Sequence, residues 1–202
     1  MGKSLQLIIY HNFNLGYYSL SMQMLSRDVA SLLKPGKDPP AEVYAVIEIP
    51  KGSGIKYELD SETALIFVDR KLSTSMTYPG NYGFIPQTRT EKGDPVDVLL
   101  LFEEPLVPMC VVACRPIGAL LTEDQDGNDP KIIAVPVAKI DPALSYVNDI
   151  AEIDKSRLAR IKHFIEHHKD LEDRKYVRIL GWTDREAAMK IIKDGMESYA
   201  NK

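Results

Sequence analysis

Apolar and polar positions alternate over the middle of the chain in the pattern of short β-strands. From Ala41 to Pro50, apolar residues occupy most alternate positions, which is typical of a strand with one buried face. The period returns from Ile55 to Asp60 and places Lys56 and Glu58 on one face. Further strands are predicted over residues 64–69, 96–102, 109–117, 118–122 and 131–137. About seven short strands separated by turns favour a small closed or partly open β-barrel.

The pattern changes to helical in the C-terminal third. A helix is predicted over residues 156–171, and its apolar stripe consists of Leu158, Ile161, Phe164, Ile165 and Leu171. Thr183 followed by Glu186 has the spacing of a capping box and predicts the start of a second helix. Strands followed by helices indicate the α+β class.

The ends of the pattern suggest how the chain is divided. Residues 1–34 show no sustained period, and residues 34–40 are rich in proline, glycine and lysine, as loops are. We expect a flexible N-terminal extension over 1–34 and a single domain over 35–202. A chain of 202 residues with 45% apolar and 27% charged residues has the composition of a globular protein.

Charge and cysteine content narrow the function classes. The net charge of −4 argues against a nucleic-acid-binding surface spread over the whole protein. On one strand, Cys110 and Cys114 would lie about 13 Å apart, too far for a disulfide, which predicts a reduced, intracellular protein. No apolar run reaches the roughly 20 residues of a membrane span. No secretory signal is evident either, and we therefore expect a cytoplasmic location without a membrane partner.

Carboxylates gather in two turns of the predicted strand region. Asp94 and Asp97 flank Pro95, and Asp124, Asp126 and Asp129 lie between two apolar strands, as the sequence shows. Aspartate favours turns, so these residues could form two solvated turns. Asp97, however, lies at the margin of an apolar run, where a buried carboxylate is costly without a cation. Oxygen ligands without nearby histidine or cysteine suit Mg²⁺ or Mn²⁺ rather than Zn²⁺.

Several basic residues adjoin acidic ones in the sequence. They are Lys56, Arg70, Lys131 and Lys169. Taken singly, each is typical of a surface ion pair of little energetic value. Brought together with carboxylate-bound metal ions and tyrosine donors, they would form a site for a phosphate compound. The spacing alone does not show whether they converge.

Seven segments, taken in order, resemble the soluble family I inorganic pyrophosphatases of the prokaryotic type. They are VIEIPKG (46–52), IKYELD (55–60), VDR (68–70), YPGNYGFIP (78–86), GDPVDVL (93–99), DPKIIAVP (129–136) and HFIEHHKDLE (163–172). The resemblance extends from Lys34 to the C-terminus. Each segment alone would be weak evidence, but their order is specific.

This resemblance implies a fold, a reaction and a set of metal ligands. The implied fold is α+β, an OB-like closed five-stranded β-barrel with additional strands and two C-terminal helices packed on it. The implied reaction is Mg²⁺-dependent hydrolysis of pyrophosphate to two phosphates, with Mn²⁺ or other divalent cations as substitutes. Asp94 would hold and deprotonate the attacking water. By the same resemblance, Asp97 and Asp129 would bind the two metals that activate this water. Asp124 would bind a further metal carried in with the substrate, and Glu48 would act through bound water.

The resemblance also implies how substrate is bound and how the chain assembles. Substrate-binding residues would be Lys56, Arg70, Tyr82, Lys131 and Lys169, with His168 beside them and Glu58 and Tyr78 in support. The family's assembly is a hexamer of two trimers. Its subunit contact would include the face of the first C-terminal helix that presents His163, His167 and Asp170.

Two positions depart from the family pattern. Lys92 stands where the family has an aspartate that binds metal, so metal affinity should fall unless Glu91 compensates. A lysine there could also point outward or contact the substrate. His168 stands where the family has a tyrosine that donates to phosphate, and an imidazole can still donate one hydrogen bond. The alternative function is a catalytically weakened relative that binds phosphate compounds or has a structural role.

Overall fold

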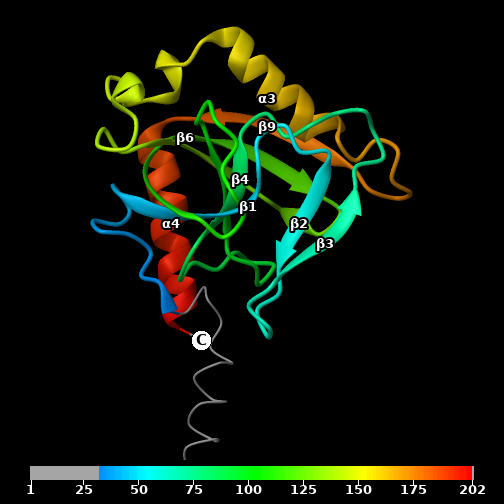
Figure 1. Ribbon diagram of the computed structural model, residues 1–202, viewed down its shortest axis with the longest axis horizontal. Coiled ribbons are helices and arrows are strands. Elements are labelled where there is room, and N and C mark those ends of the chain that lie inside the picture. Colours follow the sequence, from blue (N-terminus) through cyan, green and yellow to red (C-terminus); the bar gives the residue numbers. More distant parts are fainter. Residues whose placement is uncertain (1–31, 202) are drawn as a thin grey trace, which may run out of the picture.

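The computed structural model describes residues 32–201, and nearly all of the predicted N-terminal extension lies outside that range. Its centre is a ring of five strands (Figure 1). In spatial order these are β1 (Val43–Ile49), β4 (Asn81–Ile85), β5 (Val96–Leu100), β8 (Lys131–Pro136) and β6 (Val111–Asp124). The ring closes because β6 also pairs with β1. Its pairs are antiparallel except β5 with β8.

Further strands extend this ring. β9 (Val177–Thr183) and the short β7 (Gly127–Asn128) pair with β6. A separate two-stranded sheet consists of β2 (Ile55–Leu59) and β3 (Ile66–Lys71), which project beside the ring in Figure 1. The predicted α+β class and closed five-stranded arrangement with added strands are confirmed.

Two helices and two 3₁₀ turns complete the fold. The turns span Pro142–Leu144 and Ile150–Glu152, and the helices are α3 (Lys155–His167) and α4 (Arg185–Ala200). α3 packs on β9, and α4 packs on β6 along another side of the molecule (Figure 1). Among residues 32–201, no helix is both long and apolar enough to cross a membrane.

Local chemistry explains where the helices begin. The Asp154 carboxylate accepts hydrogen bonds from the backbone N–H groups of Ser156 and Arg157 at the start of α3. The predicted capping box at Thr183 is wrong by one residue. Thr183 ends β9, and the Asp184 side chain caps α4 by accepting from the Ala187 N–H. Pairing of β9 with β6 keeps Thr183 in the sheet, and aspartate is an equally good cap.

Other boundaries also differ from the sequence prediction. The segments predicted as two strands, 109–117 and 118–122, form the single strand β6, with a register shift between Pro116 and Gly118. The predicted first helix ends at His167 rather than at residue 171, and Leu171 is 69% exposed. No strand was predicted over β9, where alternation is weak, none of the side chains is fully buried, and Arg178 and Leu180 are exposed.

The core fills the ring and the spaces beneath the helices. Ile161 and Phe164 of α3 pack into one cluster with Leu99 and Ile133, whereas Ala188 and Ile192 of α4 pack into another. At Gly83, an added Cβ would lie 1.8 Å from the carbonyl oxygen of Val46. Only glycine permits this approach of β4 to β1. The approach sets the position of Tyr82, the neighbouring residue on β4.

Candidate active site

A cavity of about 570 Å³ lies between the ring, the β2–β3 sheet and the end of α3. Every residue predicted for the site lines it. These are Glu48, Lys56, Glu58, Arg70, Tyr78, Tyr82, Lys92, Asp94, Asp97, Asp124, Asp129, Lys131, His168 and Lys169. The lining also contains residues outside the predicted set, among them Ser61, Arg89, Thr90, Asp126 and Tyr199. The fold therefore brings these acidic and basic residues together, which their spacing in the sequence could not show.

Lys131 connects two of the predicted metal ligands. It begins β8, and its ammonium group contacts Asp97 of β5 and lies 2.7 Å from Asp129 Oδ1. The Tyr82 ring centroid lies 5.9 Å from Lys131 Nζ. Burial disfavours the charged amine, but the two carboxylates outweigh it and raise the pKa of Lys131. One cation thus already bridges Asp97 and Asp129.

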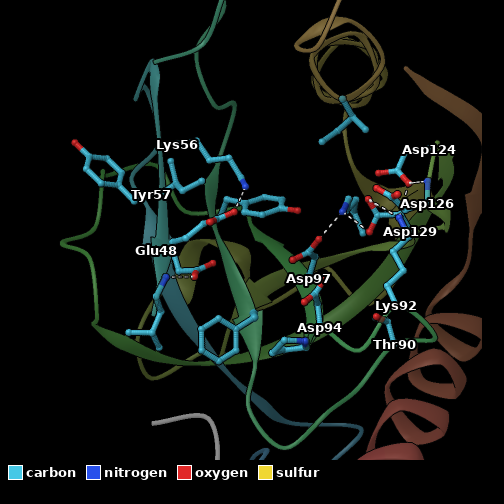
Figure 2. Close-up of a pocket in the computed structure, with 18 of the residues that line it drawn as sticks. Glu48, Lys56, Tyr57, Thr90, Lys92, Asp94, Asp97, Asp124, Asp126 and Asp129 are labelled. Atoms are coloured by element: carbon cyan, nitrogen blue, oxygen red, sulfur yellow. Dashed lines mark hydrogen bonds and ion pairs between the residues drawn. The ribbon is translucent and has the colours of Figure 1, made fainter. Parts of the chain in front are cut away.

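Asp124 is engaged by two further lysines. Lys92 Nζ lies 2.5 Å from Asp124 Oδ1 and 3.9 Å from Asp129 Oδ2, and Lys169 Nζ lies 3.4 Å from Asp124 Oδ2. Burial works to raise the pKa of Asp124, but hydrogen bonds from Lys92 and the Asp126 backbone hold it below its usual value. Figure 2 shows the Asp124, Asp126 and Asp129 group opposite Glu48, with Asp97 between them.

Asp94 stands at the rim of the cavity in a tight turn. Its carbonyl oxygen accepts from the Thr90 N–H at 2.8 Å, and Gly93 supplies a positive φ of 98° within that turn. The Asp94 side chain is exposed and forms no hydrogen bond or ion pair with any other residue in the range 32–201. Its carboxylate is therefore free to accept a proton from a bound molecule.

The β2–β3 sheet presents Lys56 and Arg70 to the cavity from paired positions. Lys56 Nζ contacts Glu58, as their predicted shared face requires, and lies 3.0 Å from Asp69 Oδ2. Arg70 Nη1 lies 2.6 Å from the same Asp69 oxygen, and its Nε lies 3.0 Å from Glu172 Oε1. Asp69 and Glu172 were not among the predicted site residues. For Asp69 the adjacent Arg70 was a cue, but nothing local connects Glu172 to Arg70.

Burial changes the protonation of Glu48 and keeps the tyrosines neutral. Burial, followed by repulsion from Asp97, raises the pKa of Glu48 to about 7, although the Leu59 N–H donates to its carboxylate at 2.8 Å. Burial also raises the pKa of Tyr78 and Tyr82. Both phenols therefore remain hydroxyl donors at neutral pH.

His168 caps the end of α3 and turns one ring nitrogen away from the cavity. Its Nδ1 lies 3.1 Å from the Phe164 carbonyl oxygen and 3.0 Å from that of Ile165. Both are acceptors, so Nδ1 bears the proton. Burial and then the nearby Lys169 lower the pKa of His168 to about 4, so the ring is neutral at pH 7. Its Nε2 is then an acceptor only, whereas the hydroxyl of a tyrosine can also donate.

The carboxylate oxygens of the cavity suit hard divalent cations, and lysine ammonium groups lie between these carboxylates in the structure. Among residues 32–201, no three histidine, cysteine, aspartate or glutamate side chains converge closely enough to hold a metal ion by themselves. Asp97 and Asp129 nevertheless share one ammonium, and Asp124 and Asp129 lie near another. Such oxygen pairs are the ligands that Mg²⁺ takes in proteins, with waters completing its coordination.

Comparison with known proteins gives the same identification over most of the chain. A family model described as inorganic pyrophosphatase matches residues 45–200. The inorganic pyrophosphatase of Aquifex pyrophilus is 53% identical over 167 residues, which is 83% of this chain and 94% of that protein. The Agrobacterium fabrum enzyme of the same name is 46% identical over 165 residues, 81% of this chain and 93% of the relative.

Solved structures agree with these relatives. The crystal structure of the inorganic pyrophosphatase from Thermus thermophilus superposes with a TM-score of 0.82 at 41% identity, covering 86% of this chain and 99% of that one. The inorganic pyrophosphatase from Helicobacter pylori gives a TM-score of 0.80 at 44% identity, covering 83% and 98%. Fold, site and sequence thus agree, and the chain belongs to the inorganic pyrophosphatase family.

Proposed function

We propose that this chain hydrolyses pyrophosphate to two phosphates with Mg²⁺ or another divalent cation as its cofactor and Asp94 as the base that activates water. The observation that supports it best is the convergence of the predicted carboxylates and cationic side chains in one cavity. Relatives about half identical over most of the chain are named inorganic pyrophosphatases, so a weakened binding or structural relative is not favoured.

The carboxylates would have two roles, which are to bind cations and to accept a proton. Asp97, Asp129 and Asp124 would hold the ions, with Glu48 acting through bound water. When bound, divalent cations neutralise the substrate's charge and lower the pKa of a water molecule to near neutrality. Asp94 forms no ion pair within residues 32–201, and its free carboxylate would orient the attacking water and take its proton.

The cationic side chains would hold the two phosphoryl groups. Lys56 and Arg70 approach from the β2–β3 sheet, whereas Lys131 and Lys169 approach from the side of Asp124 and Asp129. The Tyr82 hydroxyl would donate a hydrogen bond to a phosphoryl oxygen, with Glu58 and Tyr78 in support. Charge on the leaving phosphate is stabilised by such fixed cations, which contribute most when they are already positioned.

Phosphate release from pyrophosphate tests this assignment. In Mg²⁺, the wild-type protein should release phosphate, and Asp94→Asn should lower kcat at least about 100-fold because the base is lost. Asp194→Asn, on the exposed face of α4, is the matched control and should retain activity. Chelation of divalent ions should abolish release, and Mn²⁺ should restore part of it. Full activity in Asp94→Asn would disprove the role of Asp94.

We also propose a domain, a cellular location and an assembly for this enzyme. Residues 35–202 would form one catalytic domain, acting in the cytoplasm in phosphate metabolism as a homohexamer. Pyrophosphate would be its substrate, and neither nucleic acid nor a membrane would be a partner. Removal of pyrophosphate would drive forward the biosynthetic reactions that produce it.

A further inference from the structure

One cationic side chain of the cavity, Arg89, has no carboxylate partner. Within residues 32–201, every other lysine and arginine that lines the cavity lies within 3.4 Å of a carboxylate oxygen, namely Lys56, Arg70, Lys92, Lys131 and Lys169. The half-buried Arg89 guanidinium forms no hydrogen bond or ion pair in the same range. Because a guanidinium has five N–H donors and no acceptor, this group is available to bind an anion.

The backbone at Arg89 is held by contacts with α4 and β5. The Arg89 N–H donates to the Gly195 carbonyl oxygen of α4 at 2.8 Å. At the preceding position, the buried Thr88 hydroxyl donates to the Ile85 carbonyl oxygen and accepts from the Val96 N–H. The side chain of Arg89 therefore starts from a fixed position before any ligand binds, which lowers the entropic cost of binding.

The Arg89 guanidinium lies next to the turn that carries Asp94. A Cβ at Gly93 would be 3.6 Å from Arg89 Nη2 and 3.9 Å from its Nε, so the guanidinium lies close to the backbone that precedes Asp94. Arg89 and Asp94 both line the cavity but form no ion pair with each other. Figure 2 shows Asp94 below Asp97, on the side of the site away from Lys56. A free cation and a free carboxylate are thus neighbours at this edge.

Arg89 reaches the cavity from another side than the cations proposed to hold pyrophosphate. Lys56 and Arg70 belong to the β2–β3 sheet, and the other two contact the carboxylates on the opposite side. Arg89 instead comes from the segment between β4 and β5, and Tyr199 of the adjacent α4 also lines the cavity. A cavity of about 570 Å³ has the size of sites that hold ligands larger than pyrophosphate. Space and unpaired positive charge are therefore present beyond two phosphoryl groups.

We propose that Arg89 forms a third phosphate subsite, beside Asp94 and beyond the two that hold pyrophosphate. Its ligand is a phosphoryl group, which is either the terminal group of a linear tripolyphosphate or a free phosphate ion. A guanidinium binds such a group through two parallel N–H bonds. Without it, the Asp94 carboxylate would repel a phosphoryl group at this place. The inference extends the proposed function, because it assumes that the first two phosphoryl groups bind as described there.

Binding of analogues that cannot be hydrolysed tests the proposal. Methylenediphosphonate carries two phosphorus groups and bis(methylene)triphosphonate carries three, and both have carbon in place of the bridging oxygen. Their dissociation constants in Mg²⁺ are measured by isothermal titration calorimetry. Arg89→Met should weaken binding of the three-group analogue at least about 10-fold, because a charge-assisted contact is lost, and that of the two-group analogue less than about 2-fold. Arg89→Lys keeps the charge and should recover part of the loss.

A second titration distinguishes the two sources of the phosphoryl group. Inorganic phosphate is added to protein already saturated with methylenediphosphonate. Phosphate binding that is present in wild type and lost in Arg89→Met would support the subsite and show that it takes a free ion. If phosphate does not bind but the three-group analogue still depends on Arg89, the subsite is supported as one for the end of a chain.

The control and the contrary outcomes are defined by the same constants. Lys190→Met removes an exposed cation of α4 that pairs with Asp194 and should change neither constant. Equal losses for both analogues in Arg89→Met would overturn the proposal, and so would no loss for either. Equal affinity of wild type for the two analogues would overturn it even if the variants failed to fold. Because neither analogue is cleaved, these results do not depend on whether the wild-type protein hydrolyses pyrophosphate, which is measured separately.

Discussion

At the scale of single residues, burial rather than residue type decides the chemistry of the site. His168 illustrates this, because an imidazole could donate or accept and could be charged or neutral. Two carbonyl oxygens of α3 take its Nδ1 proton, and burial lowers its pKa to about 4. The imidazole is therefore neutral near pH 7, and its second nitrogen, Nε2, is an acceptor. By the family resemblance, a tyrosine at this position would offer a donor.

Glu48 gives a pH dependence of stability whose direction follows from its raised pKa. In the folded protein the pKa is about 7, against 4.5 for the ordinary carboxyl group. The folded state holds this proton more tightly than the unfolded state, so stability is lost as pH rises from 4.5 to 7. Glu48→Gln stays neutral, and its oxygen can still accept from the Leu59 N–H. We expect the variant to gain about 2–3 kcal/mol over wild type between pH 5 and pH 8.

The measurement is the free energy of unfolding by denaturant in EDTA, across that pH range. Glu197→Gln, on the exposed surface of α4, should show a constant difference from wild type. A constant difference for Glu48→Gln as well would contradict the assignment of a raised pKa.

At the scale of secondary-structure elements, the β2–β3 sheet depends on a distant segment to present its cations. Arg70 Nε lies 3.0 Å from Glu172 Oε1, although the two residues are 102 positions apart. The Glu172 side chain is only 9% exposed and also contacts Lys175 at 2.8 Å. The ion pair between Arg70 and Glu172 therefore connects the β2–β3 sheet to the segment that follows α3.

Loss of the ion pair between Arg70 and Glu172 should weaken substrate binding more than it lowers turnover. In Glu172→Ala, Arg70 keeps Asp69 but loses the partner that orients its guanidinium. We expect the KM for pyrophosphate to rise roughly 3- to 10-fold, as the loss of about 1 kcal/mol of charge-assisted bonding would give, with kcat changed less. Steady-state kinetics of Glu172→Ala and the matched Asp173→Ala, whose exposed side chain has no such contact, measure this. Equal KM values in both variants would argue against a positioning role.

At the scale of the whole molecule, α3 presents a histidine-rich face. The rings of His163 and His167 lie 4.6 Å apart, and His167 Nδ1 lies 2.8 Å from Asp170 Oδ2. The family resemblance assigns this face to a subunit contact. We expect a mass of six times 22.7 kDa by light scattering. A mass of 22.7 kDa would contradict this expectation.

The amino-acid sequence by itself determined the class of fold and the kinds of residue available to the site. Period-two alternation followed by helical stripes was enough for the α+β class, because these periods reflect which face of each element is buried. Asp97 was singled out because a carboxylate at the margin of an apolar strand needs a cation, whereas the roles of Asp94 and Asp124 came from the family resemblance. The ordered motifs were sufficient to name the family, which the family model and the relatives confirm.

Only the tertiary structure decided which of these groups touch and what charge they have. The strand β9 forms because β6 offers it a partner, and α4 is capped by Asp184 because that pairing retains Thr183. The contacts of Glu172 with Arg70 and of Lys92 with Asp124 join residues far apart in sequence. Electrostatic energies and pKa values depend on distance and on exclusion of water, and neither is defined until the chain has folded.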